Sequence, residues 1–334
     1  MLQSWFCAQK YGVRDAMERN EQDFLRETER VRFDWESIGA GDEYTRMLST
    51  TFKVGSQLVS ELSLEHAQNV LEVGCGPGLL TTLIADLIPT SASLMATDIA
   101  ESMVNRCKGR IFSRQVSVEN LDAQELKTIP DDSFDRYIGN LCLMLVPDPD
   151  KMIQECFRVL TSQGIAGLSL PSEPESDDVL WKMLRSFAPR AGDPRDLADI
   201  PVPFLRESPD AIRSRFLKAG FSQAVCWRYR AIISALDATQ AADLILNSHI
   251  SHFLPFLKSL TQQDKPKYIQ ELAEFFRTEM LGKGTPIGFE TILVVVKKYN
   301  SESFLSFNWT LKANNASNFQ CCMQQRRRSR FDFG

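Results

Sequence analysis

The segment that decides the fold of this chain reads Val-Leu-Glu-Val-Gly-Cys-Gly-Pro-Gly and runs from Val70 to Gly78. An apolar run meets an acidic residue and then three glycines at alternate positions. Glycine has no Cβ, so such a loop can turn sharply and let a ligand approach the backbone. In the next segment, 79–87, apolar residues recur at helical spacing. The pattern therefore predicts a strand, a glycine loop and a helix, which is the start of a Rossmann-like unit.

The glycine spacing differs from that of dinucleotide-binding loops. Those loops follow Gly-x-Gly-x-x-Gly and seat a pyrophosphate on the N-terminus of the helix. Here Leu79 stands where that pattern requires its last glycine. Glu72 also places a negative charge just before the loop, where it would repel a pyrophosphate. We therefore expect a nucleoside ligand that has no phosphates and carries a positive group.

A second acidic residue follows a second predicted strand. Residues 92–97 form this strand, and Asp98 comes directly after it. In Rossmann-like folds a carboxylate about 20 residues beyond the loop reaches the hydroxyls of a ribose. The loop and Asp98 together predict a nucleoside site.

With these residues in place, the chain resembles the class I S-adenosylmethionine-dependent methyltransferases. The resemblance is to the small-molecule branch that includes the ubiquinone and menaquinone biosynthesis methyltransferases. Further similar segments follow in order up to residue 170: 98–103, 122–125 with 130–135, and 158–160 with Gly164 before a strand at 165–170. The chain departs from the family where Ser162 and Gln163 replace a Pro-Gly pair, and Asn140 is not a residue that the family fixes.

The resemblance implies a Rossmann-like, doubly wound α/β fold with seven mostly parallel strands and a helical insertion before the last strand. We expect an N-terminal charged segment at 1–40 with one short helix, a methyltransferase domain at 41–300 and a disordered tail at 301–334. Within the domain, 171–206 and 238–283 are predicted insertions on the substrate side. Extra helices that only enlarge the core are the alternative for the second insertion.

The resemblance also implies S-adenosyl-L-methionine as cofactor and assigns residues to its parts. The methionine part of the cofactor would face Glu72 and the backbone of Gly74, Cys75, Gly76 and Gly78, and the ribose would face Asp98. The adenine would lie against Ile99, Met103, Asp122 and Ala123. The sulfonium would lie near Asn140 and Leu141. The pattern at Cys75 also fits a small apolar core residue.

Candidate catalytic residues are few. His249 and His252 lie three apart in a helical pattern, and either could act as a general base or simply pack at the surface. Asn140, near the expected methyl group, is a further weak candidate. No carboxylate or cysteine lies at a matching offset from the histidines, so no metal site is predicted. Trp35 and Tyr44 could close over the cofactor or only fix their helix on the core.

Composition limits the partners. The 334 residues, 43% of them hydrophobic, can bury one large α/β core or two small ones. A formal net charge of -5 argues against general nucleic-acid binding, which needs a basic face. No apolar run reaches membrane-spanning length, so we expect no membrane span and a cytoplasmic location. The basic cluster at 326–330 leaves a nuclear location open, and the oligomeric state stays open too.

These observations lead to one main functional hypothesis. We expect methyl transfer from S-adenosylmethionine to a small-molecule acceptor, by in-line displacement in a pocket that excludes water. A non-catalytic cofactor-binding scaffold is the alternative from another class, although a scaffold has no need to keep Glu72, Asp98 and the glycines together. A protein or RNA methyltransferase is a weaker alternative, because no Asn-Pro-Pro-Tyr motif follows the fourth strand.

Overall fold

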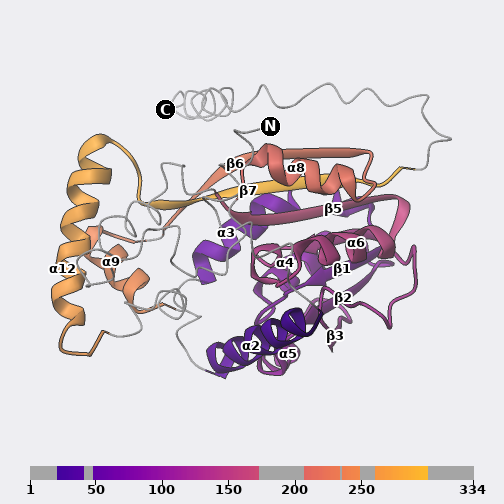
Figure 1. The fold of residues 1–334 in the computed structure, drawn as a ribbon, viewed down its shortest axis with the longest axis horizontal. Coiled ribbons are helices and arrows are strands. Elements are labelled where there is room, and N and C mark those ends of the chain that lie inside the picture. Colours follow the sequence, from indigo (N-terminus) through magenta and orange to yellow (C-terminus); the bar gives the residue numbers. More distant parts are fainter. Residues whose placement is uncertain (1–20, 41–47, 173–206, 234, 249–259, 300–334) are drawn as a thin grey trace, which may run out of the picture. The chain divides into compact units, whose positions relative to one another are not determined.

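A computed structural model describes residues 21–40, 48–172, 207–233, 235–248 and 260–299. Its centre is a seven-stranded sheet in the order β3-β2-β1-β4-β5-β7-β6 (Figure 1). The strands are β1 (Asn69–Val73), β2 (Ser93–Asp98), β3 (Ser117–Asn120), β4 (Phe134–Gly139), β5 (Leu160–Pro171), β6 (Gln223–Ile232) and β7 (Gly288–Lys297). Only β7 runs antiparallel to its neighbours, β5 and β6. The predicted mostly parallel, Rossmann-like sheet is confirmed.

Helices cover both faces of the sheet. The helices are α2 (Glu21–Ala40), α3 (Leu48–Val59), α4 (Leu79–Leu87), α5 (Glu101–Lys108), α6 (Pro149–Val159), α8 (Pro209–Lys218), α9 (Ala238–Leu246) and α12 (Lys265–Phe275). Shorter turns are η3 (Leu64–His66), η4 (Leu143–Leu145), the π-helical η6 (Phe276–Met280) and η7 (Leu281–Lys283). Apolar side chains of α6 and α8 pack on one face of the sheet, and those of α3 and α4 pack on the other. This is the doubly wound arrangement.

Local sequence signals account for several element boundaries. β1 is buried along almost all of its length, as is typical of a central parallel strand that is covered on both faces. The hydroxyl of Ser208 caps α8 by accepting a hydrogen bond from the backbone N–H of Ala211 at 3.3 Å, and Pro209 opens the helix. Gly220, with φ of 107°, follows its end. Local sequence thus accounts for both ends of this helix.

The N-terminal region differs from the expectation. Residues 21–40 form one 20-residue helix, α2, where only a short helix in a loose segment was expected. The side chain of Glu36 accepts hydrogen bonds from the backbone N–H groups of Glu101 and Ser102, at the N-terminus of α5. Arg106 on α5 donates in return to the carbonyl of Gly39 at 3.0 Å. A helix rich in charged residues is thus held by tertiary hydrogen bonds, which no local sequence pattern reveals.

The second predicted insertion contains helices before the last strand, as expected. Helices α9 and α12 pack against each other (Figure 1) and bury a cluster of their own. That cluster includes Ile233, Ile287 and the partly buried Phe289, which lie at the ends of β6 and β7. Whether these helices wall a substrate site or enlarge the core stays a prediction, as does the division of the chain into domains.

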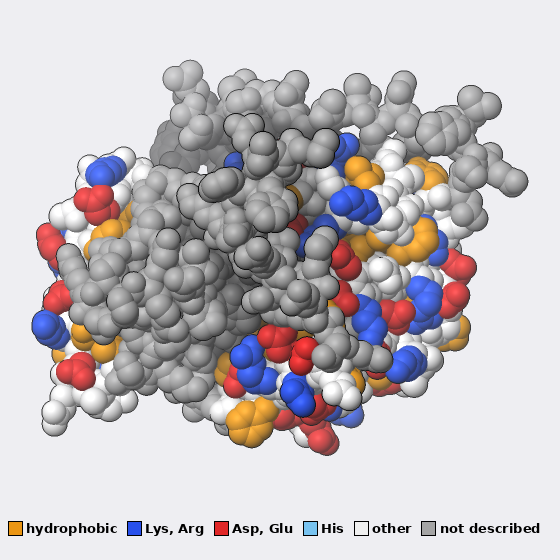
Figure 2. All heavy atoms as spheres, in the orientation of Figure 1, with side chains coloured by type: hydrophobic (Ala, Val, Ile, Leu, Met, Phe, Trp, Pro, Cys, Tyr) orange, Lys and Arg blue, Asp and Glu red, His pale blue; other side chains and the backbone are white. Residues whose placement is uncertain are grey.

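Several predicted features lie outside the described residues. They are Tyr44, residues 173–206 of the first predicted insertion, His249, His252, and the tail at 301–334 with its basic cluster at 326–330. Over the described part of the chain, no helix is both long and apolar enough to cross a membrane. On the face drawn in Figure 2, the described Lys and Arg side chains are interspersed with Asp and Glu.

Candidate functional site

The glycine loop joins β1 to α4 and has the backbone that its sequence demands. Gly74, Gly76 and Gly78 all have positive φ, at 64°, 55° and 79°. A Cβ on Gly74 would lie 2.9 Å from the sulfur of Cys142, and one on Gly78 would lie 2.6 Å from the sulfur of Cys107. Side chains are therefore excluded at both ends of the loop by conformation and by space.

Asp98 ties the loop to the end of β2. One of its carboxylate oxygens accepts from the backbone N–H of Gly76 at 2.9 Å, and the other accepts from that of Ala100 at 3.0 Å. Burial raises the pKa of Asp98 to about 6, although these backbone hydrogen bonds oppose the rise. Asn120 donates to the carbonyls of Asp98 and Ile99, both at 2.9 Å. The carboxylate is therefore fixed at the point where the loop and the second strand meet.

Glu72 lies behind the loop. Its side chain is 2% exposed and accepts a hydrogen bond of 2.6 Å from the hydroxyl of Thr81 on α4. Burial raises its pKa to about 8, with the Thr81 hydrogen bond acting in the opposite direction. This hydrogen bond joins β1, which precedes the glycine loop, to α4, which follows it.

A cavity of about 190 Å³ opens over the carboxyl ends of the strands. The elements that form it are α2, α3, the glycine loop, the ends of β2, β4 and β5, and the start of β7. Of the predicted cofactor residues, it is lined by Gly74, Gly76, Asp98, Ile99, Met103, Asp122, Ala123, Asn140 and Leu141. Glu72, Cys75 and Gly78 do not line it. Cys75 is instead buried in an apolar cluster with Cys107.

One end of the cavity carries a polar network that sequence reasoning missed. The amide nitrogen of the Gln124 side chain donates to both carboxylate oxygens of Asp122, at 3.2 Å each. Its amide oxygen accepts from the backbone N–H of Asp148 at 2.8 Å. Gln124 is 4% exposed, so this buried amide orients Asp122. On the other side of this end, Val31 and Trp35 of α2 contribute to the wall.

The middle of the cavity lies where β4 ends. Asn140 and Leu141 follow the strand, and Leu141 has a φ of 52°, which is unusual for a residue with a Cβ. The side chain of Asn140 donates to the carbonyl of Thr51 at 3.2 Å and accepts from the hydroxyl of Ser169 at 2.8 Å. Both polar groups of Asn140 are thus used within the protein, and its catalytic role stays a prediction.

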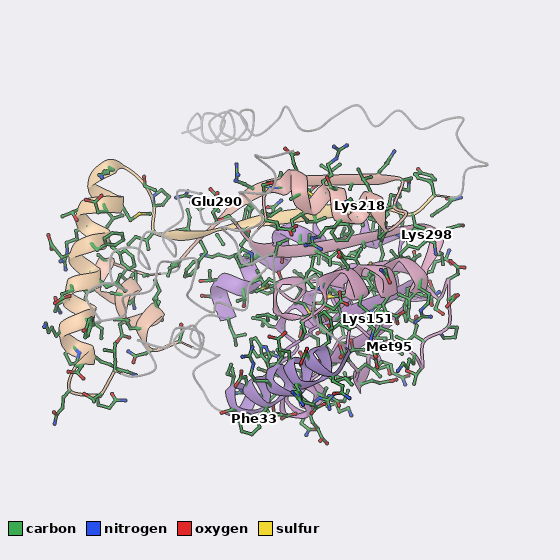
Figure 3. All side chains as sticks on the ribbon, in the orientation of Figure 1. Phe33, Met95, Lys151, Lys218, Glu290 and Lys298 are labelled. Atoms are coloured by element: carbon green, nitrogen blue, oxygen red, sulfur yellow. The ribbon has the colours of Figure 1, made fainter. Side chains whose placement is uncertain are left out.

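The far end of the cavity is formed by Pro171, Phe289, Glu290 and Thr291. Figure 3 places Glu290 near the start of β7, with Lys298 beyond the other end of that strand. The Glu290 carboxylate lies 3.4 Å from the Arg228 guanidinium and 3.3 Å from that of Arg230, both on β6. This end therefore combines apolar surface with one neutralised carboxylate.

Groups that could take a proton are scarce along the cavity. Among its described lining residues there is no histidine, lysine or tyrosine. Burial raises the pKa of the Cys142 thiol, so this side chain stays protonated and apolar. No cluster of three or more metal-ligating side chains occurs within the described ranges. The site is suited to binding and aligning molecules.

Comparisons with known proteins agree with this geometry. Residues 71–168 match the family model described as a methyltransferase domain. This match confirms the resemblance to the class I S-adenosylmethionine-dependent methyltransferases that the motifs of the chain indicate. The matched residues include the glycine loop, Asp98 and β4.

Individual relatives carry different names. The chain is 26% identical to trans-aconitate 2-methyltransferase of Variovorax paradoxus over 148 residues, which are 44% of this chain and 55% of that protein. It is 25% identical to demethylmenaquinone methyltransferase of Lactobacillus johnsonii over 163 residues, 45% of this chain and 66% of that protein. The chain thus spans between about half and two thirds of the length of these relatives.

A solved structure shows the same fold. It is a methyltransferase in complex with the Haloferax volcanii Trm112 methyltransferase activator, with a TM-score of 0.52 and 16% sequence identity. The alignment covers 80% of this chain and 98% of that one. At this identity the likeness concerns the fold alone.

Proposed function

We propose that this chain transfers a methyl group from S-adenosylmethionine to a small-molecule acceptor within the cavity. The observation that carries the proposal is the position of Asp98. Its carboxylate lines the cavity and at the same time bonds the backbone of the glycine loop at Gly76. This geometry suits a nucleoside whose ribose meets the carboxylate while its remaining part follows the loop.

The residues present fit the cofactor. Gly74 and Gly76 line the cavity without a side chain, so a ligand can approach the loop backbone closely. Ile99, Met103 and Ala123 offer apolar surface to a purine ring, and Asp122 offers an acceptor to its amino group. Asp98 would receive the ribose hydroxyls. The set holds no basic side chain, as expected for a ligand with a positive charge and no phosphate.

When bound, the cofactor supplies a methyl group activated by a positively charged sulfur. The largely apolar wall around Leu141, Met144 and Leu145 would exclude water from the cavity. Without water, the transition state, in which the positive charge of the sulfur is dispersed, is favoured over the ground state, in which that charge is localised. Alignment of donor and acceptor across the end of β4 would supply roughly 7 to 11 kcal/mol of rate acceleration. Methyl transfer of this kind depends more on a cavity that aligns the reactants and excludes water than on a strong base.

Both relatives named above carry the names of small metabolites, and this supports a small-molecule acceptor. The far end of the cavity agrees, because Pro171, Phe289 and Thr291 would face an acceptor that is partly apolar. A scaffold without catalysis and a protein or RNA methyltransferase remain the competing readings. These readings and the proposal predict different molecules as the acceptor of a labelled methyl group.

The cofactor part of the proposal is tested by calorimetry with S-adenosylmethionine and S-adenosylhomocysteine. We expect the wild type to bind both, and Asp98→Ala to weaken binding by about 10- to 100-fold, because it removes charge-assisted hydrogen bonds to the ribose. Asp86→Ala is the matched control, since Asp86 is exposed on α4. A wild type that binds neither compound contradicts the cofactor assignment and the enzyme with it.

The acceptor part is tested with methyl-labelled S-adenosylmethionine and a protein-free metabolite extract. We expect label to appear in a small-molecule fraction. Label found only on protein or on RNA would overturn the small-molecule assignment and support the other methyltransferase class. Binding without transfer to any fraction would favour the scaffold.

A further inference from the structure

The backbone at the end of β4 is strained, and something must hold it. Leu141 has a φ of 52°, in the left-handed region where a side chain costs roughly 1 to 2 kcal/mol. Gly139 ends β4 two residues before it, so the strain falls on the turn that enters the cavity wall. Strain of this kind persists only where surrounding structure determines it, and it tends to collect at functional sites.

The group that holds this turn is the hydroxyl of Ser169 on β5. It accepts a hydrogen bond from the backbone N–H of Leu141 at 2.8 Å and donates one to the side-chain oxygen of Asn140 at 2.8 Å. Ser169 is 0% exposed. One hydroxyl thus fixes both the strained backbone and the rotamer of the residue before it, a double role that needs a group able to donate and accept.

The same network reaches α3, another element that lines the cavity. The Asn140 amide held by Ser169 donates to the carbonyl of Thr51 on α3, at 3.2 Å. Asn140, Leu141 and Thr51 all line the cavity, whereas Ser169 does not. Ser169 therefore influences the cavity only through the residues that it orients.

The turn stands between the two ends of the cavity. On one side, a Cβ on Gly74 would meet the sulfur of Cys142, so the residue after the turn touches the glycine loop. On the other side, Thr51 and Asn140 line the same cavity as Pro171 and Thr291. A small rotation of this turn would change the distance and angle between donor and acceptor.

Building on the proposed function, we propose that Ser169 is a positioning residue for methyl transfer. Its hydroxyl holds the Asn140–Leu141 turn so that the donor and acceptor ends of the cavity stay in line. Loss of the hydroxyl should therefore lower the rate of transfer far more than it lowers the affinity for the cofactor. Displacements of about 1 Å in such geometry reduce rates by roughly 100-fold.

The test compares Ser169→Ala with Ser169→Thr, which keeps the hydroxyl on a β-branched side chain suited to a strand. Calorimetry measures the affinity for S-adenosylmethionine, and methyl-labelled S-adenosylmethionine with a protein-free metabolite extract measures the rate at saturating cofactor. We expect Ser169→Ala to lose about 10- to 100-fold in rate while its affinity changes by less than about 5-fold. Ser169→Thr should recover most of the rate.

Controls separate this role from general stability. Ser133→Ala removes another serine hydroxyl bond, the one of 2.7 Å to the carbonyl of Pro130, and Ser133 does not line the cavity, so it should behave as wild type. If Ser169→Ala does not fold, Ser169→Cys replaces it, because a thiol fills the same space and is a weak hydrogen-bonding group.

Two outcomes would overturn this inference and leave the proposed function unaffected. One is a Ser169→Ala chain that transfers methyl groups like the wild type. The other is a parallel loss of rate and affinity that Ser169→Thr does not restore. A wild type that fails to bind or to transfer would instead defeat the proposed function, whatever the Ser169 variants do.

Discussion

Glu72 makes the stability of the domain depend on pH in an unusual direction. Its carboxyl group is buried beneath the glycine loop, and burial raises its pKa from 4.5 to about 8. The folded state therefore keeps a proton that the unfolded state loses above pH 4.5. The contribution of Glu72 to stability is complete below that pH and is lost as the pH rises toward about 8.

This linkage is measurable with Glu72→Gln, whose amide oxygen can still accept from Thr81. We expect the melting temperature of the wild type to fall more steeply between pH 5 and about 8 than that of the variant. Asp98, whose raised pKa of about 6 has the same sign, is present in both proteins and cancels in the comparison. Parallel melting curves over this range would show that Glu72 is already ionised in the folded state.

The residues that sequence reasoning found are those with a local signature. The glycines of the loop and Asp98 stand in a fixed order after apolar runs, and the structure brings Gly74, Gly76 and Asp98 to one cavity. Ser169 and Gln124 have no such signature, because each acts on a residue that only folding brings near. Glu72 was expected to face the ligand, but on a strand buried along both faces its side chain points to Thr81.

At the scale of elements, one carboxylate on α2 contributes to its attachment to α5. Glu36 accepts from the first backbone N–H groups of α5, and α2 places Val31 and Trp35 in the cavity wall. Although burial acts to raise its pKa, hydrogen bonds from Ser102 and Glu101 give a pKa below 4.5. Its contribution is therefore present above pH 4.5 and is lost as the pH falls through the lowered pKa, opposite in sign to that of Glu72.

Removing this carboxylate should loosen the helix. We expect Glu36→Ala to cost about 0.5 to 2 kcal/mol in the packing of α2, as the loss of a helix cap does. Hydrogen exchange should become faster in residues 21–40, and S-adenosylmethionine should bind more weakly. Asp34→Ala, an exposed change on the same helix, is the control. Unchanged exchange in α2 would mean that other contacts hold it.

Element boundaries with strong local chemistry were predictable, whereas those set by tertiary contacts were not. The bounds of α4 agree with the predicted segment 79–87, since apolar periodicity and the preceding glycine loop define them. The length of α2 did not follow from its sequence, because a helix with few apolar residues gains its stability from α5. The sequence likewise gives no distinct signal for the end of α12 and the change to the π-helix η6 and the 3-10 helix η7.

At the scale of the whole molecule, the buried apolar side chains of the described residues form separate clusters. One lies between α9, α12 and η6, and it adjoins the sheet only through the ends of β6 and β7. The two largest lie on the two faces of the sheet. Clusters with few shared residues can open independently, so we expect the helical cluster to unfold without the sheet.

Leu272→Ala tests this independence, since Leu272 is 1% exposed in α12. We expect a loss of about 2 to 5 kcal/mol from the cavity left behind. Faster hydrogen exchange should be confined to α9 and α12, with β1 and β4 unchanged. Leu281→Ala, at a residue 49% exposed, should have little effect. Equal loss of protection in the central strands would show one cooperative core.

The position of β7 has a consequence for how the chain is made. Its Val294 pairs with Leu168 of β5 on one side and with Cys226 of β6 on the other, so the last strand joins β6 to the rest of the sheet. At roughly 5 to 20 residues per second, a ribosome needs several seconds to go from the end of β6 to β7. During that interval β5 has an open edge and β6 has no neighbour in the sheet, and open edges invite pairing with other chains. Synthesis of this domain therefore passes through a brief stage in which protection by a chaperone would matter most.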